Sequence, residues 1–244
     1  VENFCTATDK IAAHFHEWMT AAGGLYLRRH APYVATLFTT HATVMGRCIA
    51  GNHLPLYTDL TKFNADELAR QFNVVAKHSI EKAAAAYHDA FVTVSDITAN
   101  ECKFLLGREP DCITPNGFEN DFVWTGEEYD AKRAEARKTM ISVAEACLGE
   151  KFAEDPLIVG TSGRYEFRNK GIDVFIESLK KLAASPRLKR QVLAYITVPA
   201  ANRGPRADLQ AHLADPSKPI DGGQYKYSTH YLEYQNSDPI VNAL

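Results

Sequence analysis

Residues 11–41 read IAAHFHEWMTAAGGLYLRRHAPYVATLFTTH, and this stretch decides the fold. The apolar run over residues 11–16 predicts a strand, residues 20–30 predict a helix, and residues 33–38 predict the next strand. The polar residues 39–41 end that second strand. A strand, a helix and a second strand in close succession are the unit from which parallel sheets with right-handed crossovers are built.

The same alternation continues along the chain. Further strands are predicted at residues 91–95, 111–114, 157–160 and 192–196, and further helices at residues 79–88, 96–107, 129–148 and 171–184. Another helix start is predicted at Asn64, because Glu67 follows this capping residue by three positions. Asp96 is the expected cap of the helix that ends at Gly107. The pattern predicts the α/β class in two incomplete units that join near residues 149–156. Pro, Gly, Asp and Lys dominate residues 199–223, which predicts a loop-rich surface segment.

The composition excludes several classes of protein. Of the 244 residues, 45% are hydrophobic and 23% are charged, as in an ordinary globular protein. The formal net charge of −3 gives no basic footprint for nucleic acid or for an anionic membrane. No apolar run approaches the roughly 20 residues that span a bilayer, and residues 1–5 do not resemble a secretory signal. Since the chain begins without methionine, we expect it to be a segment of a longer protein.

Cysteine spacing and short motifs exclude further kinds of site. The five cysteines are an odd number, and no two of them have the spacing of zinc ligands. We therefore expect reduced thiols and a cytoplasmic protein. The sequence contains no G-x-S-x-G or H-E-x-x-H motif, no phosphate loop and no G-x-G-x-x-G motif. These absences argue against an ATPase and against a nicotinamide-dependent enzyme.

Polar residues that follow the predicted strands are the candidate ligand-binding residues, because open parallel sheets bind ligands beyond the carboxyl ends of their strands. They are His16-Glu17-Trp18, Thr39-Thr40-His41, Ser95-Asp96, Asn116-Gly117 and Ser162-Gly163-Arg164. Strand alternation places His14 and His16 on one face. His16 is either an imidazole that faces a ligand hydroxyl or a buried histidine that backbone groups satisfy. The pair Asn116-Gly117 is first of all a turn signal, and close approach of its backbone to a ligand is the alternative.

The most informative segment is residues 163–171, GRYEFRNKG, which follows a predicted strand and leads into a helix. It places three cations, Arg164, Arg168 and Lys170, within seven residues. Arginine grips phosphate oxygens with two N–H groups, lysine acts as a point charge, and a helix N-terminus adds backbone donors. The segment is therefore a candidate diphosphate site, and a solvated basic loop is the alternative.

Seven segments together resemble one family. They are residues 13–18 (AHFHEW), 37–47 (LFTTHATVMGR), 78–85 (HSIEKAAA), 91–98 (FVTVSDIT), 114–117 (TPNG), 163–171 (GRYEFRNKG) and 237–240 (SDPI). In this order they are similar to glycogen synthase of the animal and fungal type, which is glycosyltransferase family 3. The resemblance extends over most of the chain.

The resemblance implies a GT-B fold, in which two Rossmann-like domains with parallel sheets enclose the active site. Residues 1–150 resemble the second half of the N-terminal domain. Residues 151–244 resemble the beginning of the C-terminal nucleotide-sugar domain, with the loop-rich segment 199–223 inside it. The family transfers glucose from UDP-glucose to the non-reducing end of an α-1,4-glucan, retains the anomeric configuration and uses no metal or other cofactor. The full-length protein is expected to be a homo-oligomer.

The resemblance also implies roles for single residues. His16 matches the family histidine that contacts the donor glucose. Arg164 and Lys170 match the cations that grip the diphosphate and stabilise the departing UDP. Further substrate contacts are expected at Thr40, His41, Asn116 and Gly117. Whether Thr40 and His41 line the cleft or brace it stays open.

Two departures from the family limit what the chain does alone. The family's glycine-rich donor loop and its later paired glutamates have no counterpart here, so we expect the isolated chain to be inactive. The short stretch after residue 199 fits a bacterial or otherwise compact relative. Two alternatives remain: a related retaining GT-B transferase with another sugar nucleotide, and a noncatalytic module for glucan binding or assembly.

Overall fold

A computed structural model describes residues 4–6, 8–153, 155–221, 223 and 225–244. The chain forms two compact units, residues 1–118 and residues 119–244. We predicted a division near residue 150, after the long helix α6 (Gly126–Leu148) instead of before it. The helix belongs to the second unit by its contacts, because the Tyr195 hydroxyl bonds the carbonyl of Met140 and Ala146 packs against Leu209.

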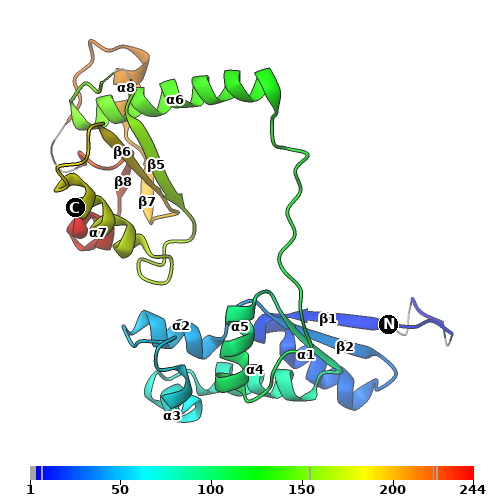
Figure 1. The fold of residues 1–244 in the computed structure, drawn as a ribbon. Coiled ribbons are helices and arrows are strands. Elements are labelled where there is room, and N and C mark those ends of the chain that lie inside the picture. The colour runs from blue at the N-terminus through cyan, green and yellow to red at the C-terminus, as the bar shows by residue number, and fades with distance from the viewer. Residues whose placement is uncertain (1–3, 7, 154, 222, 224) are drawn as a thin grey trace. The chain divides into compact units, whose positions relative to one another are not determined.

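The first unit is built on a parallel sheet in the order β1-β2-β3-β4. Strands β1 and β2 of this sheet are labelled in Figure 1. Its strands are β1 (Ala12–His16), β2 (Ala35–Thr40), β3 (Ala90–Thr93) and β4 (Cys112–Ile113). The register pairs Phe15 with Phe38 and Phe38 with Phe91, so three aromatic rings lie on one face of the sheet. These strands confirm the predicted α/β class with parallel pairing.

The helices of the first unit cover the aromatic face and the adjoining edge of the sheet. They are α1 (Glu17–His30), α2 (Val44–Gly51), α3 (Ala65–Gln71), α4 (Val75–Tyr87) and α5 (Asp96–Glu101), with a short 3-10 turn (Leu60–Lys62) and a π-helical turn (Cys102–Leu106). Helices α1 and α4 contact each other, and Ala21 and Ala84 pack with Phe38 and Phe91 in the main core. A second core joins α2, α3 and the π-helical turn through Ile49, Ala69 and Leu105.

Small residues let α1 approach the core closely. A Cβ atom added at Gly24 would lie 1.9 Å from Nε2 of His88 and 2.8 Å from a ring carbon of Phe15, so only glycine fits there. The His88 side chain is buried, and burial holds its pKa below the ordinary value. The neutral ring therefore belongs to the apolar core between α1 and the sheet.

Local capping follows the sequence with one exception. Asn64 caps α3 by accepting the N–H of Glu67, as predicted. Helix α5 is capped by Ser95, which accepts the N–H of Thr98, and not by Asp96 as we expected. The residue before the helix has the extended backbone that a cap requires, whereas Asp96 already lies in the first turn.

The second unit has a parallel pair, an antiparallel pair and four helices among the residues that the structure describes. The pairs are β5 (Leu157–Ser162) with β6 (Val192–Thr197) and β7 (Asn202–Pro205) with β8 (His230–Leu232). The helices are α6, α7 (Ile172–Ala183), α8 (Ala207–Ala214) and α9 (Pro239–Ala243), with a 3-10 turn (Gln235–Ser237). Strand β5, helix α7 and strand β6 form the predicted strand-helix-strand unit.

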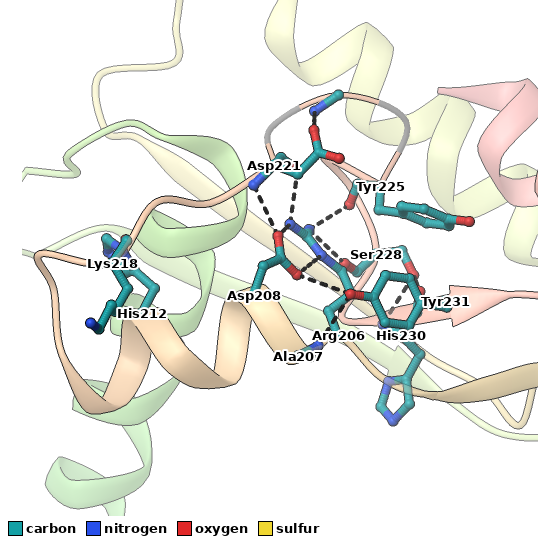
Figure 2. Close-up of polar contacts among 11 residues, drawn as sticks. Arg206, Ala207, Asp208, His212, Lys218, Asp221, Tyr225, Ser228, His230 and Tyr231 are labelled. Carbon is teal, nitrogen blue, oxygen red and sulfur yellow. Dashed lines mark hydrogen bonds and ion pairs between the residues drawn. The ribbon is translucent and has the colours of Figure 1, made fainter.

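The segment predicted to be rich in loops, residues 199–223, contains β7 and α8. Its centre is Arg206, whose side chain is only 1% exposed. Figure 2 shows the guanidinium group enclosed by Asp208 and by three backbone carbonyl groups. Its N–H groups donate to Asp208 at 2.6 and 3.1 Å, to Tyr225 at 2.8 Å, to Ser228 at 3.2 Å and to Asp221 at 3.0 Å.

The ion pair between Arg206 and Asp208 holds Asp221, Tyr225 and Ser228 at the start of helix α8. One carboxylate oxygen of Asp208 also accepts the N–H of Asp221 at 3.0 Å. The hydrogen bonds from Arg206 hold the pKa of Asp208 far below its ordinary value, and they raise the pKa of Arg206. Both groups are therefore charged throughout the neutral range. The local composition suggested a loop, whereas a buried ion pair with nonlocal partners orders the segment.

Two further predictions concern the whole chain. None of the five cysteines, which all lie in described parts of the chain, forms a disulfide bond. No helix among the described residues is long and apolar enough to cross a bilayer.

Candidate functional site

Three histidines gather at the carboxyl ends of β1 and β2 in the first unit. His14 and His16 lie on the same face of β1, as predicted, with ring centres 4.0 Å apart. His41 follows β2, and its Nε2 lies 3.1 Å from Nδ1 of His16. Nε2 of His14 bonds the Thr39 hydroxyl at 2.7 Å. The parallel register brings these residues together because it pairs His14 with Leu37 and His16 with Thr39.

The histidine cluster (His14, His16 and His41) lies at the surface of the first unit. Burial lowers the pKa of His14, and positive charge on His16 or His41 would lower it further. His14 and His16 are exposed, and His41 is half-buried, so the cluster forms part of the molecular surface. Neutral imidazoles at a surface can each donate one hydrogen bond and accept another. The cluster therefore suits recognition of hydroxyl groups.

Glu17 connects the ends of the two strands. Its carboxylate accepts the backbone N–H of His41 at 3.0 Å. Its backbone has a φ of 64°, in the left-handed region that side chains other than glycine seldom adopt. Such strain is concentrated at functional sites. The sequence placed Glu17 among the residues that follow a strand, but gave it no role of its own.

Thr40 lies beneath this surface. Its side chain is fully buried, and its hydroxyl lies 3.2 Å from the Ala42 carbonyl and 3.1 Å from Glu81 Oε1. The other carboxyl oxygen of Glu81 accepts the N–H of Val44 at 2.9 Å. The contacts of Thr40 are thus all internal, and this residue stabilises the turn between β2 and α2.

The buried carboxyl group of Glu101 also stabilises the turn between β2 and α2. Glu101, which is 6% exposed, accepts the hydroxyl of Thr43 at 2.7 Å and the hydroxyl of Tyr57 at 3.1 Å. A Cβ atom at Gly46 would lie 2.3 Å from the Glu101 carboxylate, so glycine is required for this approach. Sequence reasoning did not find Glu81 or Glu101. The available signal was an acidic residue within an otherwise apolar helix face.

The pKa of Glu81 is raised to about 7 from its ordinary value of 4.5, mainly because the side chain is buried, and the carboxylates of Glu17 and Glu101 add to this effect. In the unfolded chain the carboxyl group titrates at its ordinary value. Between pH 4.5 and about 7 the folded state thus keeps a proton that the unfolded state has lost. Glu81 therefore makes the first unit less stable as pH rises through this window.

We expect Glu81→Gln to remove this pH dependence. The amide can accept the N–H of Val44 and donate to the Thr40 hydroxyl, as a protonated carboxyl group does. The free energy of unfolding of the variant, minus that of the wild type, should increase from pH 5 to pH 7 by up to about 1.4 kcal/mol per pH unit, and then level off. Glu81 is the only ionisable group that differs between the two proteins, so the contributions of the other groups cancel in the difference.

The measurement is urea unfolding followed by Trp18 fluorescence in a Trp124→Phe background, which makes the signal specific to the first unit. Glu67→Gln, at an exposed position on α3, is the matched control and should show a difference that hardly changes with pH. A constant difference for Glu81→Gln across pH 5 to 8 would contradict the assignment.

Asn116 and Gly117 lie in an extended segment after β4. Both are exposed, and neither has the positive φ that the predicted Asn-Gly turn requires. A Cβ atom at Gly117 would meet no atom within 4 Å. The backbone hydrogen bond from Thr114 to Thr93 continues the direction of the sheet instead of turning the chain. The expected turn is therefore wrong, and a substrate contact at these two residues stays a prediction.

The predicted basic loop lies in the second unit, between β5 and α7. Arg164 and Lys170 are exposed, and Arg164 forms an ion pair with Glu166 at 3.2 Å. Gly171 has a φ of 65°, which lets the chain turn directly into the helix. The loop therefore presents cations to the surface, as both a diphosphate site and a solvated basic loop require, and the diphosphate site stays a prediction.

The N-terminus of α7 offers fewer free backbone N–H groups to an anion at this loop than we expected. The N–H groups of Ile172 and Asp173 both bond the carbonyl of Phe167, at 3.0 and 3.3 Å. Asp173 also places a carboxylate in the first turn, where it pairs with Arg168 at 3.1 Å. Arg164 and Lys170 are thus better placed to hold an anion than the backbone amides at this helix end.

Across the described ranges, no group of three or more His, Cys, Asp or Glu side chains has a geometry that can hold a metal ion.

Comparison with known proteins adds an independent observation. A family model described as glycogen synthase matches residues 1–208. A glycogen [starch] synthase of Dictyostelium discoideum is 36% identical over 200 residues, which cover 79% of this chain and 23% of that protein. The glycogen [starch] synthase isoform 2 of Saccharomyces cerevisiae is 36% identical over 200 residues, with 79% of this chain and 28% of that protein covered.

The human liver glycogen [starch] synthase is 33% identical over 199 residues, which cover 78% of this chain and 28% of that protein. The chain thus spans about a quarter of the length of the curated relatives that it matches. The matched region includes both the histidine cluster and the basic loop. The chain belongs to the glycogen synthase family.

Proposed function

We propose that this chain is part of an enzyme that transfers glucose from UDP-glucose to the non-reducing end of an α-1,4-glucan, with retention of the anomeric configuration. The observation that carries the proposal is the family match over residues 1–208. The histidine cluster at the surface supports it, because imidazole nitrogens can form hydrogen bonds with sugar hydroxyl groups. A homo-oligomeric full-length protein in the cytoplasm is part of the same proposal.

In this reaction we assign roles to the residues that match functional residues of the family. His16 contacts the donor glucose through the ring nitrogen that faces away from His41. Arg164 and Lys170 hold the diphosphate and offset the negative charge that develops on the departing UDP. Fixed charges directed at a leaving group stabilise the transition state more than the ground state, which is the condition for catalysis.

The test is transfer of labelled glucose to glycogen, with UDP-glucose and ADP-glucose compared as donors. Two proteins are assayed: this chain, and the chain extended to the length of its curated relatives. We expect transfer from UDP-glucose by the extended protein only, because the chain spans about a quarter of those relatives. Preference for another donor would replace the substrate assignment. Glycogen binding without transfer from either donor would favour a noncatalytic module.

A further inference from the structure

The contact between His16 and His41 has only two possible proton arrangements in the neutral state. Nδ1 of His16 and Nε2 of His41 are 3.1 Å apart, so one of them donates and the other accepts. A neutral imidazole carries a single N–H. The arrangement chosen here therefore decides whether the outer nitrogen of His16, Nε2, is a donor or an acceptor.

His41 is held in place from both sides. The carboxylate of Glu17 accepts its backbone N–H at 3.0 Å. The preceding residue, Thr40, is fully buried and bonded to Glu81. His41 is also more buried than His16. These contacts fix the backbone of His41 and leave its ring directed at His16. A side chain held in this way can orient the ring of its neighbour.

Burial favours one of the two arrangements. If His16 donated through Nδ1–H, the proton of the half-buried His41 would lie on Nδ1, for which no hydrogen-bond partner is found in the described part of the chain. If His41 donates through Nε2–H, its Nδ1 is only an acceptor, and the outward N–H belongs to the exposed His16. An unpaired donor is easier to satisfy at the surface, by water or by a ligand, than in a half-buried site.

We propose that His41 is a positioning residue, which donates its Nε2–H to Nδ1 of His16 and thereby keeps the His16 proton on Nε2 as a hydrogen-bond donor to a sugar hydroxyl. The sugar as the acceptor rests on the proposed function, whereas the hydrogen bond between the histidines does not. Thus His41, which we first considered as a substrate contact, acts through His16.

Nitrogen NMR of this chain, labelled with ¹⁵N at histidine, tests the hydrogen bond directly. The spectra are recorded at pH 8. We expect a scalar coupling across the hydrogen bond between the two facing nitrogens. The shared proton should be attached to Nε2 of His41, and His16 should carry its own proton on Nε2. A shared proton attached to Nδ1 of His16, or no coupling, would overturn the proposal.

Variants separate a specific hydrogen bond from general packing. His41→Phe should abolish the coupling and move the Nδ1 resonance of His16 to the position of a nitrogen without a donor. His41→Gln offers an amide N–H and should restore the bonded position. His30→Gln, on α1 of the same unit, is the control and should leave the His16 resonances unchanged. If His41→Phe does not fold, the wild-type coupling and His41→Gln still decide the question.

Activity of the extended protein adds a readout that depends on the proposed function. His41→Phe should lower kcat on the order of 10²-fold, and His41→Gln should recover part of the loss, because a misplaced catalytic group has effects of this size. A wild-type protein that transfers no glucose would reject the proposed function. The NMR experiment would still test the hydrogen bond between His16 and His41, because it does not depend on activity.

Discussion

Replacing Arg206 with methionine is expected to destabilise the second unit by about 3–5 kcal/mol. Methionine keeps much of the side-chain length but removes every donor. The carboxylate of Asp208 and the carbonyls of Tyr225, Ser228 and Asp221 would then lose their shared partner. Removing one member of such an ion pair costs more than removing both, because the Asp208 carboxylate, which is only 21% exposed, is left without its partner.

Hydrogen exchange across residues 200–232, together with urea unfolding followed by circular dichroism, measures this effect. The double variant Arg206→Met with Asp208→Leu should be more stable than Arg206→Met alone. Arg203→Met, at an exposed position on β7, is the matched control and should change stability by less than about 0.5 kcal/mol. Equal stability of Arg206→Met and the control would show that the ion pair does not order the segment.

In the extended protein, Arg164→Ala and Lys170→Ala are each expected to lower kcat by about 10²–10³-fold, with little change in the KM for glycogen. Loss of one preorganised group that stabilises charge in the transition state has an effect of this size. The two losses should not add in the double variant, because both cations act on the same leaving group. The measurement is initial-rate kinetics of glucose transfer from UDP-glucose.

Arg168→Ala is the matched control, since this cation lies in the same loop and has its own ion pair, as Arg164 does, but matches no diphosphate-binding residue of the family. It should reduce kcat much less than the other two variants. Three equal losses would mean that the loop contributes only general positive charge. Full activity in both Arg164→Ala and Lys170→Ala would remove them from the mechanism.

The candidate site shows where sequence reasoning succeeds. Residues that follow parallel strands were expected to meet at one edge of a sheet, and His16 and His41 do so. The shared face of His14 and His16 follows from strand alternation, which is a purely local rule. Turn propensity, which is also a local rule, failed at Asn116 and Gly117, because the chain does not turn at these residues. Turn propensity is a preference that the surrounding chain can override.

The buried carboxyl groups show what a local rule misses. Glu81 bonds Thr40 across 41 positions of sequence, and Glu101 bonds Thr43 across 58 positions. An acidic side chain on a helix is ordinarily exposed, so local sequence gives little reason to place it in a core. Its burial depends on partners that only the assembled fold supplies.

The sequence by itself determined the family, the α/β class, the approximate bounds of the strands and helices, and the polar residues at the strand ends. It could do so because hydrophobic periodicity and capping depend on neighbours along the chain. Only the tertiary structure decided which nitrogen of His41 meets His16, which acids are buried, and how Arg206 orders a segment rich in Pro and Gly. These features depend on hydrogen bonds and burial between residues far apart in sequence, which no local pattern encodes.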